Sequence, residues 1–313
     1  MKKILYIIIP CYNEFNTLQS TSSIFINKLN TLIKWKVISE KSRLLFVDDG
    51  STDDTFVYLK KIAKKQKTVK AISLSRNVGH QIALLAGLDY AKQSCDMSIT
   101  IDADLQDDID KIDEMIDCYY KGNDIVYGVR KNRLSDSFFK RTTAEAFYRF
   151  QKLLGVEIVF NHADFRLLSR RAMESLLEYK EQNVYIRGIV TKLGYKSCKV
   201  YYDRKRREVG STKYSLPKMI SLALNGITSF SISPLRLIMF IGFLFAIVSF
   251  VGVVWSIIRS LTGNTVVGWA SMTSIICFVS GIQLLCIGII GEYIGKIYIE
   301  TKNRPRYFIS EKV

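Results

Sequence analysis

Short runs of Ile, Val and Leu alternate with longer amphipathic segments over the first 130 residues of the chain. A short apolar run bounded by turn residues is typical of a buried strand, whereas apolar positions about three or four residues apart are typical of a helix. This alternation predicts βαβ units, and therefore an α/β fold with a mostly parallel sheet. We expect strands at residues 5–9, 44–47, 69–74, 97–101 and 125–129, with helices at 17–33, 53–65, 80–92 and 110–120 between them.

The pattern changes after residue 130. Aromatic and basic positions at helical spacing predict one amphipathic helix at residues 135–154. Two later apolar runs, at residues 165–168 and 198–202, predict further strands of the same domain. Residues 215–233 are moderately apolar, with a proline near their start, and predict a helix that lies in the membrane interface.

Two runs near the C-terminus contain no charged residue. They cover residues 237–258 and 269–290, and each has 22 residues, about 33 Å as a helix, which is enough to cross a bilayer. The loop between them carries a single positive charge, whereas the stretch 204–236 just before the first run holds seven Lys and Arg residues and the tail after the second holds five. The positive-inside rule then places both ends of the chain in the cytoplasm. We therefore predict a plasma-membrane protein with a cytosolic domain at residues 1–213, an interfacial helical region at 214–233, and a transmembrane hairpin with a cytosolic tail at 234–313.

The composition narrows the choice of partners. The chain has 313 residues, 48% of them hydrophobic, and a formal net charge of +16. Such a charge fits either nucleic acid or an anionic membrane surface, and the two apolar runs favour the membrane, so no nucleic acid partner is expected. The apolar start, residues 4–10, is too short for the core of a signal peptide and is better explained as a strand. The six cysteines lack any Cys-x-x-Cys spacing, so we expect neither a zinc site nor a disulfide framework.

A pair of aspartates follows the expected strand at residues 97–101. Asp102 and Asp104 are separated only by Ala103, and carboxylates at this spacing can share one hard cation at the mouth of a sheet. A metal ion that binds a phosphate group is therefore the leading hypothesis. The alternative is that the two acids only form a turn or cap the next helix.

Polar residues also follow the first two expected strands. Residues 10–14 read Pro-Cys-Tyr-Asn-Glu, and residues 48–53 read Asp-Asp-Gly-Ser-Thr-Asp. Because parallel strands bring their carboxyl ends to one edge, we expect both groups beside the Asp102 loop, where a nucleotide would lie. Asp48 and Asp49 could accept hydrogen bonds from a base or from ribose hydroxyls, and a simple turn is the alternative for the residues that follow them.

Taken together and in this order, these motifs resemble those of the family 2 glycosyltransferases of GT-A fold. Three further features narrow the resemblance to polyprenyl-phosphate glycosyltransferases, similar to bacterial GtrB-type enzymes and dolichol-phosphate-mannose synthases. They are the run Ser-Arg-Asn-Val-Gly-His at residues 75–80, the run Asp-Phe-Arg at 164–166, and the C-terminal hairpin. The resemblance covers essentially the whole chain. It implies a Rossmann-like domain, a nucleotide-sugar donor and a membrane polyprenyl phosphate as the acceptor.

The resemblance also implies roles for acidic residues. Asp102, Asp104 and Gln106 would hold Mg²⁺ or Mn²⁺ against the donor pyrophosphate, with Asp102 serving donor binding and Asp104 serving catalysis. Asp164 resembles the acidic residue that the family places near the reacting sugar. It would act as a base or, alternatively, orient the sugar or pair with Arg166.

Arginines suit the second substrate, because a planar guanidinium binds phosphate oxygens in two places. By the resemblance, Arg130 and Arg141 would hold the lipid phosphate. Relatives often place Ser or Thr one turn later, and here the residues after Arg141 read Thr-Thr-Ala-Glu, which leaves that partner open. Arg204 and Lys213, in the basic stretch before the first span, are expected on donor phosphates, with a patch on anionic lipid heads as the alternative. The nucleotide pocket would be lined by Pro10, Tyr12, Glu14 and Asp49.

We therefore expect an inverting enzyme that transfers one hexose, glucose from UDP-glucose, to undecaprenyl phosphate, giving a lipid-linked sugar for cell-envelope glycosylation. A phosphate monoester has a second pKa of about 6 and is already an anionic nucleophile, so a strong base is dispensable. A processive synthase, which in this fold uses a Gln-x-x-Arg-Trp motif, is not expected, because the chain has no such motif.

Three alternatives to this function remain: another donor such as UDP-N-acetylglucosamine, a non-catalytic lipid-phosphate carrier, and a soluble-type sugar nucleotidyltransferase. Glycines in the two spans would permit a homo-oligomer through close helix packing.

Overall fold

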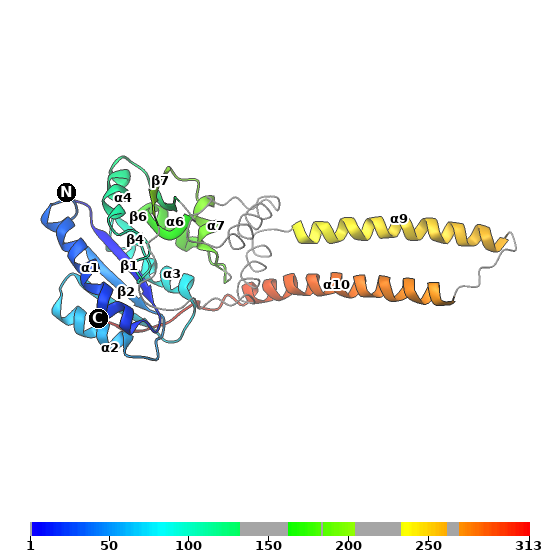
Figure 1. Ribbon diagram of the computed structural model, residues 1–313, viewed down its shortest axis with the longest axis horizontal. Coiled ribbons are helices and arrows are strands. Elements are labelled where there is room, and N and C mark those ends of the chain that lie inside the picture. Colours follow the sequence, from blue (N-terminus) through cyan, green and yellow to red (C-terminus); the bar gives the residue numbers. More distant parts are fainter. Residues whose placement is uncertain (1, 132–161, 183, 204–232, 262–268) are drawn as a thin grey trace.

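The computed structural model describes residues 2–131, 162–182, 184–203, 233–261 and 269–313 (Figure 1). All seven strands expected from the sequence are present, and so are the four helices expected before residue 130. The helices expected at 135–154 and 215–233 lie outside the described residues, apart from residue 233.

The elements of the N-terminal domain follow one another along the chain as β1 (Leu5–Cys11), α1 (Phe15–Lys34), β2 (Arg43–Asp48), α2 (Thr55–Lys65), β3 (Val69–Leu74), α3 (His80–Ala91), β4 (Met97–Thr100), α4 (Lys111–Tyr120), β5 (Ile125–Arg130), β6 (His162–Ser169), α6 (Arg170–Glu178), α7 (Ile186–Lys192) and β7 (Ser197–Tyr202).

These strands and β8 (Ile309–Lys312) form one sheet in the order β7-β5-β6-β4-β1-β2-β3-β8. The pairs β1/β2, β1/β4, β2/β3 and β5/β7 are parallel. β6 runs antiparallel to both β4 and β5, and β8 runs antiparallel to β3. Six strands of this sheet therefore point one way and two point the other, which confirms the predicted α/β fold with a mostly parallel sheet.

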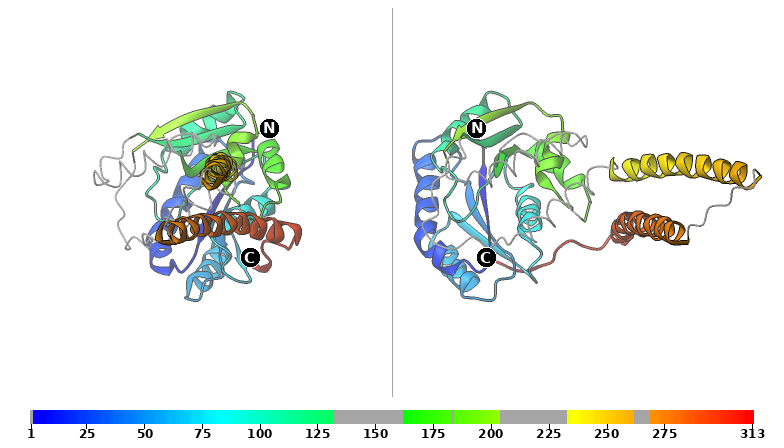
Figure 2. Two further views of the ribbon diagram at one scale, coloured as in Figure 1. Left: turned by 90° about the vertical axis from the view of Figure 1, so that its right-hand side faces the viewer. Right: turned by 45° about the vertical axis from the view of Figure 1, so that its right-hand side comes forward.

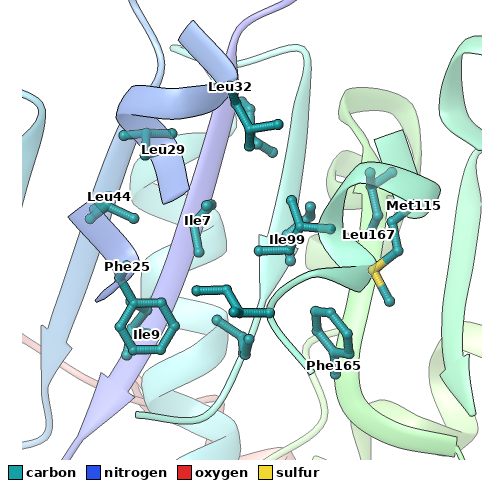
Figure 3. Packing of buried hydrophobic residues seen from close by; sticks show 14 of the residues in the cluster. Ile7, Ile9, Phe25, Leu29, Leu32, Leu44, Ile99, Met115, Phe165 and Leu167 are labelled. Atoms are coloured by element: carbon teal, nitrogen blue, oxygen red, sulfur yellow. The ribbon is translucent and has the colours of Figure 1, made fainter. Parts of the chain in front are cut away.

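The sheet lies between two layers of helices, with α1 on its outer side and α3 on the side that faces the long C-terminal helices (Figures 1 and 2). Alternate residues of each strand enter opposite layers. Ile7 and Ile9 pack with α1, α2 and α4, whereas Tyr6 and Ile8 pack with α3, α6 and α7. Figure 3 shows the first of these clusters, where Phe25 of α1 lies beside Ile9. Because both faces are covered, the strands read as continuous apolar runs in the sequence.

Helix α3 packs so closely on the sheet that it needs a glycine. A Cβ added at Gly87 would lie 2.5 Å from a methyl carbon of Ile8 and 2.9 Å from one of Val47. Ala is favoured over Gly in a helix by about 1 kcal/mol, but overpacking a core costs about 1 to 3 kcal/mol, and these β-branched methyls have little freedom to move. We expect Gly87→Ala to lower the unfolding free energy by about 1 kcal/mol, measured by thermal unfolding of the full chain in detergent. An unchanged or raised midpoint would mean that α3 can shift away from the sheet.

The last residues of the chain return to the sheet, which their polar sequence does not predict. β8 pairs with the edge strand β3, and the N–H of Ser75 donates to the carbonyl of Phe308 over 2.9 Å. The N–H of Val313 donates to the carbonyl of Ala71 over 2.8 Å. Figure 1 shows the tail running from the C-terminal helices back to the sheet. The predicted division of the chain remains a prediction, with the addition that the end of the tail is structurally part of the N-terminal domain.

Two long helices, α9 (Ser233–Leu261) and α10 (Trp269–Thr301), occupy the places of the two predicted spans. They contact each other and extend away from the sheet (Figures 1 and 2). Among the described residues, one helical segment, Phe278–Thr301, is long and apolar enough to cross a membrane. It overlaps the predicted span at 269–290 and continues to the end of α10, and the span at 237–258 stays a prediction.

Candidate functional site

The carboxyl ends of six strands and the start of β6 meet at one edge of the sheet, because β6 runs against its neighbours. Asp48 ends β2, Arg130 ends β5 and Tyr202 ends β7, while Asp102 and Asp104 follow β4 directly. Ligands of open α/β sheets bind at this edge. The predicted convergence of the polar motifs on one edge is therefore confirmed.

A cavity of about 220 Å³, which we call the donor cavity, opens beside the end of β1. All four residues predicted to form a nucleotide pocket line it, namely Pro10, Tyr12, Glu14 and Asp49. Asn77, Gly79 and His80, from the loop before α3 and from its first turn, complete the wall. The cavity thus combines an exposed aromatic ring, a buried carboxylate and a helix N-terminus within reach of one ligand.

Asp49 holds one wall of the donor cavity in place. Its carboxylate oxygens accept hydrogen bonds from the backbone N–H of Val78, over 2.8 Å, and of Gly79, over 2.9 Å. The next residue, Gly50, has φ +64, and a Cβ there would lie 2.6 Å from the carbonyl carbon of Arg76, so the turn needs glycine. Each carboxylate oxygen can accept a second hydrogen bond. The loop contacts of Asp49 therefore leave room for a contact with a ligand.

The loop after β4 concentrates negative charge. Leu105 has φ +52, a left-handed conformation that costs a residue with a Cβ roughly 1 to 2 kcal/mol, and such strain gathers at ligand sites. The N–H of Gln106 donates to the carboxylate of Asp104 over 3.2 Å. The side chain of Asp102 is 37% exposed, yet its enclosure raises its pKa to about 6, with His80 opposing the shift and nearby carboxylates adding to it. A bound cation would relieve this excess of negative charge.

The residues of this loop fit a divalent cation. The described residues contain no cluster of three His, Cys, Asp or Glu side chains placed to hold a metal. The predicted set is smaller, two carboxylates of Asp102 and Asp104 and the amide of Gln106, and all three offer the hard oxygen ligands that Mg²⁺ prefers. Mg²⁺ usually binds one or two carboxylates and takes its other ligands from water and substrate phosphates. Two acids and an amide are therefore sufficient if a diphosphate completes the site.

Asp164 lies near the start of β6 and is surrounded by cations. Its carboxylate pairs with Arg166 over 2.6 Å and with Arg187 of α7 over 2.9 Å. The side chain of Arg166 is only 1% exposed. Burial alone would raise the pKa of Asp164, but the charges of the two arginines hold it well below its usual range. His80 connects this pair to the acidic loop, with its Nε2 lying 3.7 Å from Asp164 and 3.5 Å from Asp102.

A second polar cluster links the acidic loop to Arg130. The phenol of Tyr202 and the guanidinium of Arg130 both donate to one carboxylate oxygen of Asp107, and the Nε of Arg130 donates to the phenol over 3.2 Å. Asp107 is 1% exposed, and its second oxygen has no hydrogen-bond partner among the described residues. Burial and the charge of Asp107 raise the pKa of Tyr202, so the phenol keeps its proton at neutral pH. The cluster fixes the orientation of Arg130, whose side chain is 24% exposed.

The structure gathers most of the residues singled out in the sequence, and three of them, Arg141, Arg204 and Lys213, lie outside the described residues. It also adds Asp107, Tyr202 and Arg187, to which the sequence assigns no role. The sequence could have pointed to Asp107 and Tyr202 as site residues, because Asp107 lies in the acidic motif after β4 and Tyr202 ends an expected strand. No sequence feature marks Arg187 as a site residue, since only the packing of α7 places it against Asp164.

Comparison with known proteins identifies two regions of the chain. The model of the family described as Glycosyl transferase family 2 matches residues 6–177, and that of the GtrB C-terminal hairpin matches residues 233–297. The uncharacterized glycosyltransferase YkoT of Bacillus subtilis is 49% identical over 98% of this chain and 91% of its own. The prophage bactoprenol glucosyl transferase homolog of Escherichia coli is 39% identical over 97% of both chains. Among solved structures, the glucosyl-3-phosphoglycerate synthase of Mycobacterium tuberculosis covers 72% of this chain and 78% of its own, with 16% identity and a TM-score of 0.45.

The match to the family extends over more than half of the chain, and the relatives align along nearly all of it. The mixed, mostly parallel sheet of eight strands is the GT-A fold expected of that family. This chain is therefore a glycosyltransferase and belongs to glycosyl transferase family 2.

Proposed function

We propose that this enzyme transfers a single hexose, glucose from UDP-glucose, to undecaprenyl phosphate at the cytoplasmic face of the membrane. The observation that carries the proposal is the similarity, over nearly the full length and including the hairpin, to proteins named bactoprenol glucosyl transferases. The site supports it, because the donor cavity and the acidic loop offer adjoining places for a nucleotide and its diphosphate. The product is a lipid-linked sugar of the kind used for cell-envelope glycosylation.

The donor would lie with its nucleoside in the donor cavity, against Pro10, Tyr12, Glu14 and Asp49, and with its diphosphate toward the loop after β4. Arg204 and Lys213 would add charge on the donor phosphates. Mg²⁺ or Mn²⁺ would be held by Asp102, Asp104 and Gln106 and would act as a Lewis acid on the nucleoside diphosphate as it leaves.

The acceptor phosphate would be bound by Arg130, with Arg141 as its second arginine. Arg130 suits this task because Asp107 and Tyr202 orient its planar guanidinium before the substrate arrives. The lipid phosphate is already ionised at neutral pH and attacks the anomeric carbon as its C–O bond to the diphosphate breaks. One in-line displacement inverts the anomeric configuration.

Asp164 would orient the sugar through its charge and its contact with His80, rather than accept a proton. A carboxylate that two arginines hold ionised is a weak base, since the pKa of Asp164 is far below the pH of the cytoplasm. The proposal needs no base, because the acceptor is an anion. Asp164 thus contributes by position and electrostatics.

The position of β8 supports the proposed hairpin topology. β8 is hydrogen-bonded into the sheet of the N-terminal domain, so in a membrane both ends of the chain would lie on the same side. A chain with both ends on one side crosses the membrane an even number of times. If Phe278–Thr301 is one crossing, α9 is the natural second one, as the charge pattern predicts. The domain at residues 1–213 and the tail would then both be cytosolic, with 214–233 at the interface.

A Tyr202→Phe variant is expected to weaken use of the lipid substrate. The hydroxyl of Tyr202 contacts both Asp107 and Arg130, and hydrogen bonds to charged groups contribute roughly 1.5 to 3 kcal/mol, so KM for undecaprenyl phosphate should rise about tenfold. KM for UDP-glucose should change little, because the donor cavity is not touched. Tyr201→Phe, at the exposed neighbouring residue, is the matched control. Equal changes in both KM values would instead indicate a general loss of structure.

The proposed function is tested by incubating the purified full-length enzyme with undecaprenyl phosphate, Mg²⁺ or Mn²⁺, and one labelled nucleotide sugar at a time. Label from UDP-glucose is expected in the organic phase after lipid extraction. Label only from UDP-N-acetylglucosamine would replace the donor but keep the reaction class. Retention of lipid without any sugar transfer from any donor would favour a non-catalytic carrier.

A further inference from the structure

A second and larger cavity, about 500 Å³ in volume, lies where α10 ends and the tail turns back toward the sheet. We call it the tail cavity. It shares Asn77 and Gly79 with the donor cavity, and its other walls come from α10, the tail, the loop before α3 with the first turn of that helix, and the stretch between α6 and α7. Nothing in the proposed reaction uses it.

The tail cavity is strongly basic. Arg76, Lys302, Arg304 and Arg306 line it, and no acidic side chain does so in the described part of the chain. None of the ion pairs formed between described residues involves Arg76, Lys302 or Arg304. Several cations around one space repel each other, and the nearby Glu300 and Glu181 act on Arg306 alone among the four, so a bound anion would stabilise this arrangement.

Three of the four cationic residues contact the surrounding structure. The Nζ of Lys302 lies 4.0 Å from the ring centroid of Tyr298, a cation–π contact. The side-chain amide of Gln182 donates to the carbonyl of Arg304 over 2.7 Å, and Arg306 donates to the carbonyl of Tyr179. These contacts join α10, the tail and the stretch between α6 and α7 around the cavity.

The position of the tail cavity indicates the kind of anion. It lies at the end of the candidate span Phe278–Thr301, which in the proposed orientation is the cytoplasmic end. Basic residues just cytoplasmic of a membrane helix attract anionic lipid headgroups. Apolar side chains complete the wall, among them Val78, Ile82 and Ile299, and suit a lipid, whose acyl chains are apolar, better than a bare ion.

We propose that the tail cavity is a binding site for a phosphate-bearing anion, the headgroup phosphate of an anionic membrane lipid or a free phosphate, distinct from the donor cavity and from Arg130. The assignment of the anion to a membrane lipid rests on the membrane orientation given under the proposed function. Anion binding itself does not depend on whether the enzyme transfers sugar. A loss of anion binding in the tail cavity would therefore leave the proposed sugar transfer untouched, and a failure of the proposed sugar transfer would leave the anion site untouched.

The test compares the full-length protein with Lys302→Gln/Arg304→Gln and with a control of equal charge loss, Lys65→Gln/Lys67→Gln, at exposed residues near the start of β3. Each protein, in an uncharged detergent, is titrated with phosphatidylglycerol, phosphatidylcholine, inorganic phosphate and UDP, and bound species are counted by native mass spectrometry. We expect the cavity variant to bind phosphatidylglycerol at least about fivefold more weakly than the wild type and the control, with UDP binding unchanged.

The arms of this experiment separate the sources of the anion. Displacement of phosphatidylglycerol by inorganic phosphate at similar concentration would support a free-phosphate site, and no displacement would support a lipid site. Equal binding of phosphatidylglycerol by the cavity variant and the control would overturn the proposal. A loss of UDP binding in the cavity variant alone would also overturn it, because the cavity would then belong to the donor site.

Discussion

Replacing Asp104 by asparagine is expected to lower the rate of sugar transfer to undecaprenyl phosphate by about a thousandfold or more, since a Lewis-acid site supplies several kcal/mol of charge stabilisation as a diphosphate leaves. Asparagine preserves the size of the side chain and an oxygen that can accept the hydrogen bond from the N–H of Gln106, so the loop should keep its shape. What the variant loses is the negative charge. The rate is measured with purified full-length enzyme and labelled UDP-glucose, with lipid extraction as the readout.

Asp110→Asn is the matched control for Asp104→Asn, because it removes one carboxylate at a largely exposed position a few residues along the same chain segment. The control should keep nearly full activity. UDP binding adds a second readout, since Mg²⁺ or Mn²⁺ should tighten it in the wild type and not in Asp104→Asn. An Asp104→Asn enzyme that transfers sugar at the control rate would remove the acidic loop from the mechanism.

Replacing Asp164 by alanine is expected to cost about 3 to 5 kcal/mol of unfolding free energy, the usual result of removing one partner of a buried ion pair. The reason is Arg166, whose guanidinium is 1% exposed and pairs with Asp164 over 2.6 Å. The thermal midpoint of the full chain in detergent should fall by roughly 10 °C. Adding Arg166→Met to the variant should recover much of this loss, because no charge then remains buried at that point. A midpoint within experimental error of the wild type would show that Arg166 does not depend on this carboxylate.

The effect of Asp164 depends on pH in a defined direction. In the folded protein the pKa of Asp164 is held well below its usual range, whereas in the unfolded chain it is about 3.9. The stabilisation is therefore complete above the unfolded value and is lost as the pH falls from there toward the folded value. The stability difference between the wild type and Asp164→Ala should be constant near neutral pH and should shrink below about pH 4. A difference that grew on acidification would contradict the ion pair.

The sequence predicts the central part of the fold because that part is governed by local rules. β1 and β2 are covered on both faces, so their apolar runs are visible without knowledge of the partners. The acidic loop is equally visible, because Asp102 and Asp104 follow such a run and the carboxyl ends of parallel strands share an edge. The same rule applied to β1 and β2 brings residues 10–14 and 48–53 to this edge, and the family resemblance assigns Pro10, Tyr12, Glu14 and Asp49 among them to the nucleotide pocket.

Other features depend on contacts between distant segments, which local patterns do not contain. The stretch Ile309–Lys312 reads Ile-Ser-Glu-Lys, and it becomes β8 only because the edge of β3 is available to it. Arg187 reaches Asp164 because α7 packs on the sheet, and nothing in the surrounding sequence marks it. The short helices α6 and α7 were equally unpredictable from periodicity, since each spans fewer than three turns.

The most direct test of the central claim is the mass and linkage of the lipid product formed by the purified full-length enzyme from UDP-glucose and undecaprenyl phosphate with Mg²⁺ or Mn²⁺. We expect undecaprenyl phosphate that carries one hexose in a phosphodiester linkage, with inverted anomeric configuration relative to the donor, and no lipid with two or more sugars. Undecaprenyl phosphate recovered unchanged while the nucleotide sugar is consumed, or a product with retained configuration, would contradict it.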